Sequence, residues 1–293
     1  MRRRNRGWES FIDARWRLGV SLDDKGLLTK TPGRFVPLKK VSMFESAKLK
    51  VERAKEHVGD LENAFRRFIQ TDPQSLSIGN DPHTGAITVE VRLREAIPSA
   101  LSLILGDAIH NLRTALDHVT WELIGLDGGT QDRQTAFPFS KTLADYEATC
   151  NGINTPRDDT KKFFLSLAAY EGGAGEKLYG LNKLDNADKH RFLTPVIGVA
   201  SIGHLKVVAP NGVTVMTLKN TRFGMGPDGY ARMMSVGHGL SVQLDKDSHP
   251  SLDIFFGDVE FFKAMPLIET LMELSDSIAH TIGQFQSFVS NRK

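Results

Sequence analysis

Eight apolar side chains between residues 44 and 68 recur at alternating steps of three and four residues. Because an α-helix completes a turn every 3.6 residues, this spacing places all of them on one face, with charged residues between them. It predicts a long amphipathic helix that begins near residue 43 and ends before Asp72 and Pro73. Such a helix cannot bury its apolar face alone, so it must pack against other elements. The eight residues are Phe44, Ala47, Val51, Ala54, Val58, Leu61, Phe65 and Phe68.

Two further long segments have the same helical period. The first, residues 98–124, starts at Pro98, which suits the first turn of a helix, and Gly128 and Gly129 stop it. The second covers residues 260–289 and closes the chain. Shorter helices are predicted over residues 142–150, 160–170 and 174–190. We expect the three long helices to pack as an antiparallel bundle, with the last of the short helices as its fourth member.

Two parts of the chain instead alternate apolar and polar residues at a period of two. Residues 86–93 predict one strand between the first two long helices. From residue 192 to 258 the same alternation recurs, for example in Leu240, Val242 and Leu244. Turn signals such as Asn211-Gly212 separate these stretches. This second part predicts an antiparallel sheet of four to six strands.

These patterns predict an α+β fold: an antiparallel bundle of long helices with an antiparallel β-sheet inserted before the C-terminal helix. We expect four regions along the chain. They are an irregular basic N-terminal arm (1–40), a helical bundle core with one strand (41–191), the antiparallel sheet (192–258), and a C-terminal helix that completes the bundle (259–293).

The composition indicates where such a protein acts. Cys150 is the single cysteine, which excludes an internal disulfide framework and fits a reducing compartment. No stretch approaches the ~18–20 apolar residues needed to span a bilayer, so we expect a cytoplasmic protein without membrane contacts. The first 72 residues contain 17 Lys and Arg against 10 Asp and Glu. This excess permits contact with phosphates such as those of RNA, although it is also typical of a solvated surface.

The helix predicted over residues 98–124 has an unusual polar side. Hydrogen-bonding and ionisable groups occupy the whole arc opposite its leucine line. A solvated helix face ordinarily uses Lys, Glu and Gln, whereas this one uses mainly Asp, Asn, Thr and His, which are poorer helix formers. The pattern indicates either a functional site or a buried hydrogen-bond network, and both interpretations stay open. The residues on this arc are Asp107, His110, Asn111, Arg113, Thr114, Asp117 and His118.

An arginine and a histidine on this arc suit chemistry on a phosphate. Imidazole can take or give a proton near neutral pH, and guanidinium stays charged and can bind phosphate through two donors. One Arg and one His beside a phosphodiester suffice for RNA cleavage without a metal. The base activates the 2′-hydroxyl, and the cation stabilises the charge on phosphorus.

The segment Arg113-Thr114-Ala115-Leu116-Asp117-His118 resembles the Arg-x(4–6)-His signature of the HEPN superfamily of all-helical, usually dimeric ribonuclease and nucleotide-binding domains. The resemblance implies RNA cleavage at a site shared by two subunits of a homodimer. Arg113 would bind phosphate and His118 would be the general base, with no metal or other cofactor. Supporting roles would fall to Asp107, His110, Asn111, Asp117, Asp188 and His190.

Three short blocks also resemble bacterial proteins of unknown function: residues 106–113, 137–139 and 188–191. The last of these follows the final leucine of the helix predicted over 174–190. Its cations could complement the dipole at a helix C-terminus. Alternatively, Asp188 and His190 could join the polar side of the helix over 98–124, because bundles assemble sites from facing helices.

Two other functions fit the same residues. One is a non-enzymatic ligand- or partner-binding protein whose polar helix face is a structural network. The other is a metal-dependent enzyme. The metal would then be held by one of two ligand pairs at helical spacing, Asp107 with His110 or His118 with Glu122. Asp188 or His190 would be the third ligand. The sequence leaves open whether the protein is an enzyme.

Overall fold

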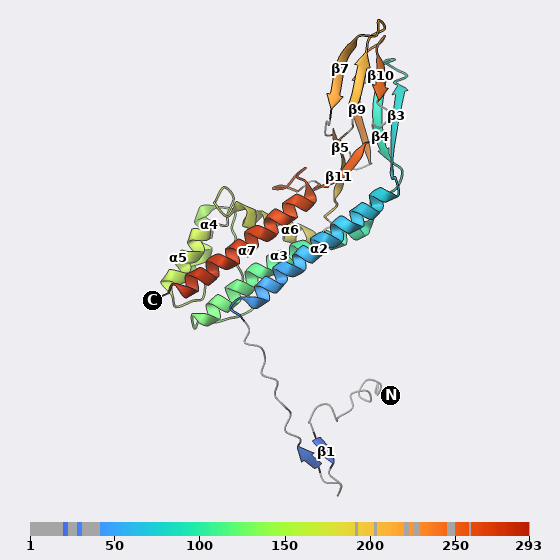
Figure 1. Cartoon of the computed structure of the whole chain (residues 1–293). Helices are drawn as coiled ribbons and strands as arrows, with labels where there is room; N and C mark the ends of the chain where they lie inside the picture. Colours follow the sequence, from blue (N-terminus) through green and yellow to red (C-terminus); the bar gives the residue numbers. More distant parts are fainter. Residues whose placement is uncertain are drawn as a thin grey trace, which may run out of the picture. The chain divides into compact units, whose positions relative to one another are not determined.

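The computed structural model in Figure 1 describes residues 20–22, 28–30, 42–190, 193–201, 204–219, 223–225, 229–244, 250–257 and 259–292. The chain divides into two units, Met1–Ser42 and Met43–Lys293. In the first unit, β1 (Val20–Leu22) pairs antiparallel with β2 (Leu28–Lys30). The arm predicted over residues 1–40 therefore contains a strand pair, and the rest of it lies outside the described residues.

Helices of the second unit confirm the predicted bundle of long helices. α2 (Glu45–Gln70) and α3 (Ser99–Leu126) lie side by side, and α7 (Leu267–Ser290) contacts both of them. α6 (Glu176–His190) packs against α3 and α7. The apolar face of α2 is buried as the spacing of three and four residues requires, and only Phe65 is partly exposed. The two short helices, α4 (Leu143–Asn151) and α5 (Asp158–Leu167), contact each other.

The last helix begins later than the sequence predicts. The apolar spacing predicts a helix over residues 260–289, whereas α7 starts at Leu267, directly after Pro266. Proline disfavours helical backbone in the residue before it, so the helix cannot extend backwards through Met265. Residues 259–264 instead form turns, and Phe262 among them packs into the core of the bundle.

In the described part of the second unit, the strands form three antiparallel sheets of three strands each, so the prediction of one sheet is wrong. Their orders are β3-β4-β9, β10-β6-β7 and β11-β5-β8. The bounds are β3 (Gln74–Asn80), β4 (Ile87–Leu93), β5 (Val196–Ser201), β6 (His204–Val208), β7 (Thr214–Lys219), β8 (Phe223–Gly224), β9 (Tyr230–Val236), β10 (Ser241–Leu244) and β11 (Ser251–Phe255).

One of these sheets joins distant parts of the sequence. β4 is the strand predicted over residues 86–93, and it pairs with β3 on one side and with β9 on the other. β3 was missed because it is largely exposed and carries few apolar residues. The strands surround their own apolar core, and Phe68 from the end of α2 belongs to it. This sheet therefore includes two strands from between α2 and α3, whereas the other two sheets lie within the predicted region 192–258.

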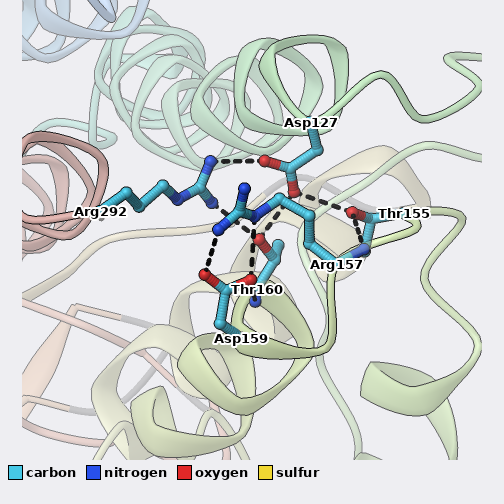
Figure 2. Close-up of polar contacts among 6 residues, drawn as sticks. All are labelled: Asp127, Thr155, Arg157, Asp159, Thr160 and Arg292. Atoms are coloured by element: carbon cyan, nitrogen blue, oxygen red, sulfur yellow. Dashed lines mark hydrogen bonds and ion pairs between the residues drawn. The ribbon is translucent and has the colours of Figure 1, made fainter.

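A buried polar cluster ties α3 to α5 and to the segment after α7 (Figure 2). Asp127 is the residue that ends α3, and its fully buried side chain pairs with Arg292 at 2.5 Å. The other carboxylate oxygen of Asp127 accepts hydrogen bonds from the hydroxyls of Thr155 (2.8 Å) and Thr160 (2.7 Å). The Arg292 guanidinium also donates to Thr160 and lies over the ring of Phe288. Because these groups are buried together, each depends on the others for its partners.

No helix in the described part of the chain is long and apolar enough to cross a membrane.

Candidate functional site

Solvent reaches the middle of α3 along one narrow strip. The residues on this strip are exposed or half-buried, whereas the leucine line on the opposite side lies in the core. α2 borders the strip on one side, since the Lys50 ammonium donates to the Asn111 side chain at 3.1 Å. α6 borders the other side, through contacts to Asn182 and Asp185. The strip consists of Leu103, Asp107, His110, Thr114, His118, Trp121 and Gly125.

Arg113 is held by protein groups at the α6 border. Its Nε donates to Asn182 Oδ1 at 2.9 Å, and its Nη1 pairs with Asp117 Oδ1 at 2.5 Å. Its guanidinium carbon lies 4.5 Å from the ring centre of Phe139. The side chain is 12% exposed. These contacts assign Arg113 to packing between α3, α6 and the loop that follows α3, so little of it is accessible to a phosphate.

His118 lies toward α2 instead. It lines a hollow of about 750 Å³, which we call the tryptophan hollow. Asp117 also lines this hollow, but Arg113 does not, so the predicted catalytic pair does not share it. The Asp117 carboxylate is engaged by Arg113 and by the backbone N–H of Phe137 at 2.9 Å. The hollow is lined by Ser46, Asp117, His118, Trp121, Glu122, Gly125, Leu126, Gln131 and Thr135.

The surroundings of His118 favour its neutral form. Partial burial lowers the pKa of the His118 imidazole most, and the nearby Lys50 ammonium lowers it further, while Asp117 acts in the opposite direction. Its folded-state pKa is therefore below its unfolded value of 6.5. The stability that this difference contributes is present above about pH 6.5 and is lost as the pH falls through the folded pKa.

Lys50→Met is expected to raise the pKa of His118, because it removes a cation while leaving the burial in place. Burial is the larger cause, so the pKa stays below 6.5. A titration of the His118 ring protons by NMR measures this shift. Lys48→Met on the same helix is the control and should leave the titration unchanged. An unchanged His118 pKa in Lys50→Met would contradict the placement of Lys50 beside His118.

His110 is the histidine of the strip with a partner suited to catalysis. Its Nδ1 lies 3.1 Å from Asp185 Oδ1, and the His110 side chain is 57% exposed whereas Asp185 is 2% exposed. An ionised carboxylate only accepts hydrogen bonds, so Nδ1 donates and Nε2 keeps its lone pair. Lys189 pairs with the second oxygen of Asp185 at 2.5 Å. A buried carboxylate thus orients an exposed imidazole.

His110 opens onto a second hollow, of about 460 Å³, between α3 and α6. We call it the histidine hollow; it is lined by Ser102, Leu103, Gly106, Asp107, His110, Asp188 and His190. Asp188 and His190 come from the end of α6, so the structure brings them to the polar side of α3. Gly106 makes room for this approach, since a Cβ there would lie 2.5 Å from Asp188 Oδ2.

Asp188 lines the histidine hollow, and the pKa of its carboxyl is raised. Burial raises the pKa of its carboxyl, and the neighbouring carboxylates Asp185 and Asp107 raise it further. The backbone N–H of Leu193 and the nearby His110 act in the opposite direction.

The remaining predicted site residues have local partners. Asn111 donates from its side-chain amide to the carbonyl of Asp107 at 2.8 Å and accepts from Lys50. Glu122 accepts the backbone N–H of Phe44 at 2.9 Å and so caps the start of α2. Among the described residues, no three His, Cys, Asp or Glu side chains lie so that they could hold a metal ion. The predicted pairs Asp107 with His110 and His118 with Glu122 thus have no third ligand there.

Sequence reasoning missed the two α6 residues that hold side chains of α3, Asn182 at Arg113 and Asp185 at His110. A signal for Asp185 was present. It follows Leu178 by seven residues and Leu181 by four, so it falls on the buried face of its helix. A buried carboxylate needs a hydrogen-bond donor or a cation as its partner, so this position of Asp185 indicates a contact with another side chain.

No family model, no curated protein and no solved structure matches this chain.

Proposed function

We propose that this protein cleaves RNA by metal-independent acid–base catalysis in the histidine hollow, with His110 as the general base. One observation carries the proposal: the exposed imidazole of His110 is held at Nδ1 by the buried carboxylate of Asp185, 3.1 Å away. This arrangement fixes the tautomer whose Nε2 can accept a proton, and it stabilises the imidazolium that forms. Nε2 also lies 3.4 Å from the hydroxyl of Thr114, which a substrate hydroxyl would replace.

RNA suits this site because it carries its own nucleophile. His110 Nε2 takes the proton of the 2′-hydroxyl, and O2′ attacks the adjacent phosphorus. The bond from phosphorus to O5′ breaks, and O5′ receives a proton from the imidazolium of His190, the second histidine of the hollow. The products are a 2′,3′-cyclic phosphate and a 5′-hydroxyl. Asp185 is a positioning residue, because it acts through His110.

This proposal departs from the roles that the HEPN resemblance implies. It keeps the helix and the reaction, but it moves the base from His118 to His110 because Arg113 is engaged by Asn182, Asp117 and Phe139. Both histidines of the hollow belong to one chain, so the chemistry does not require a second subunit. The homodimer stays a prediction. We place the activity in the cytoplasm, where a lone thiol such as Cys150 stays reduced.

The experiment is to incubate the purified protein with a single-stranded RNA in the presence of EDTA, beside a DNA of the same sequence. We expect cleavage of the RNA with cyclic phosphate ends, and intact DNA, because DNA lacks the 2′-hydroxyl. Failure to cleave RNA, or equal cleavage of the DNA, would overturn the proposal.

The second candidate function is a non-enzymatic binding protein. The observation that favours it is the engagement of Arg113 by Asn182 and Asp117, as in a structural network. It predicts that the protein binds RNA or another partner without producing new ends, so the same incubation separates the two functions.

A further inference from the structure

Trp121 is an aromatic side chain exposed at the other end of the α3 strip. Its side chain is 44% exposed, although it belongs to one of the largest helices of the core. It lines the tryptophan hollow together with His118. Gln131 donates from its side-chain amide to the backbone carbonyl of Trp121 at 2.6 Å, which ties the loop after α3 to the helix at this point. The loop after α3 therefore forms one side of the hollow that the indole lines.

The charged groups of the tryptophan hollow are already engaged. Asp117 accepts from the Phe137 N–H and pairs with Arg113, and Glu122 accepts from the Phe44 N–H. His118 is held toward its neutral form by burial and by Lys50. Besides these two engaged carboxylates, the hollow offers a ligand an indole ring and the uncharged side chains of Ser46, Gln131 and Thr135. An uncharged planar ring with hydrogen-bonding edges fits these groups better than a phosphate or a compact cation.

We propose that the tryptophan hollow binds a nucleobase of a single-stranded nucleic acid, stacked on Trp121. Base stacking on an exposed aromatic residue is a common mode of single-strand recognition, and it tolerates different bases. The neutral His118 imidazole lines the same hollow and can hydrogen-bond with the base edge.

The path of the nucleic-acid strand along α3 rests on the proposed function. Trp121 follows His110 by eleven residues on the same strip, which is about 16 Å along the helix axis. A strand of a few nucleotides that lies along α3 would place one base on Trp121 and a phosphodiester at His110. The hollow thus acts as a substrate-binding subsite beside the reaction centre.

The test uses single-stranded DNA, which has bases and phosphates but no 2′-hydroxyl, so binding is measured without cleavage. Fluorescence anisotropy of a labelled DNA strand gives the Kd. Trp121→Leu is expected to weaken binding by about 5- to 150-fold, the effect typical of one base–aromatic stack. Trp121→Phe keeps a ring and should retain most of the affinity. Val215→Ser, which removes a comparably exposed apolar side chain on β7, is the matched control and should bind like the wild type.

The outcomes separate this inference from the proposed function. Unchanged affinity in Trp121→Leu would overturn the base site, whether or not RNA is cleaved. An equal loss in Trp121→Leu and Trp121→Phe would also overturn it, because stacking would then not be the cause. Binding that depends on Trp121, in a protein that does not cleave RNA, would leave the base site standing and remove the proposed activity.

Discussion

Asp127→Ala is expected to lower the free energy of unfolding by about 3–5 kcal/mol, the usual effect of removing one partner from a buried ion pair. The variant leaves the guanidinium of Arg292, 13% exposed, without its carboxylate, and it removes the acceptor of the Thr155 and Thr160 hydroxyls. These contacts join α3, α5 and the segment after α7, so their loss weakens the closure of the bundle (Figure 2). Urea denaturation followed by circular dichroism measures the change.

The neighbouring pair of Arg157 and Asp159 provides a matched control. Both side chains are largely exposed, and their hydrogen bonds join residues two apart in the sequence. Arg157→Ala is therefore expected to leave the unfolding transition almost unchanged. The double variant Asp127→Leu with Arg292→Met should recover much of the lost stability, since no buried charge is left unpaired. A loss below about 1 kcal/mol in Asp127→Ala would contradict the account of a buried pair.

Asp185→Asn is expected to lower kcat for RNA cleavage by about 100-fold, the lower end of what a positioned base contributes. Asparagine keeps the size of the side chain, but its amide N–H can donate to His110 Nδ1. The imidazole is then no longer held in the tautomer whose Nε2 can accept a proton. KM should change little, because Asp185 is 2% exposed and does not reach the substrate. Steady-state kinetics separate the two parameters.

Lys189→Ala is the control for Asp185→Asn. It removes the cation on the other oxygen of Asp185 but leaves the hydrogen bond to His110 intact. We expect its kcat to stay near that of the wild type. If Asp185→Asn raised KM and left kcat unchanged, Asp185 would shape the binding surface rather than position His110.

The helices were predictable because the spacing of apolar residues along each segment identifies the face that is buried. The steps of three and four residues along α2 describe a face that is buried, as found. The sheets were less predictable, because their pairing depends on contacts between distant segments. Nothing in residues 86–93 indicates that β4 pairs with β9, about 140 residues later. β3 escaped detection because only Leu76 and Ile78 in it are apolar, an alternation too short to predict a strand.

The candidate site was predictable to the level of one helix face and no further. The unusual composition of the polar side of α3 drew attention to His110, and the block at the end of α6 drew attention to Asp188 and His190, which line the same hollow. The sequence could not show which polar groups would be covered. That depends on where α6 and the loop carrying Phe139 lie, and they engage Arg113 while leaving His110 open.

RNA cleavage in EDTA by His110→Gln and His118→Gln decides whether His110 is the base. Both variants replace a histidine on the same strip of α3. Circular dichroism of each variant checks that it keeps the fold of the wild type. We predict that His110→Gln loses about 10²–10⁴-fold in kcat, the contribution of a general base, while His118→Gln keeps a kcat close to that of the wild type. Full activity in His110→Gln, together with a loss of activity in His118→Gln, would show that His118 and not His110 is the base.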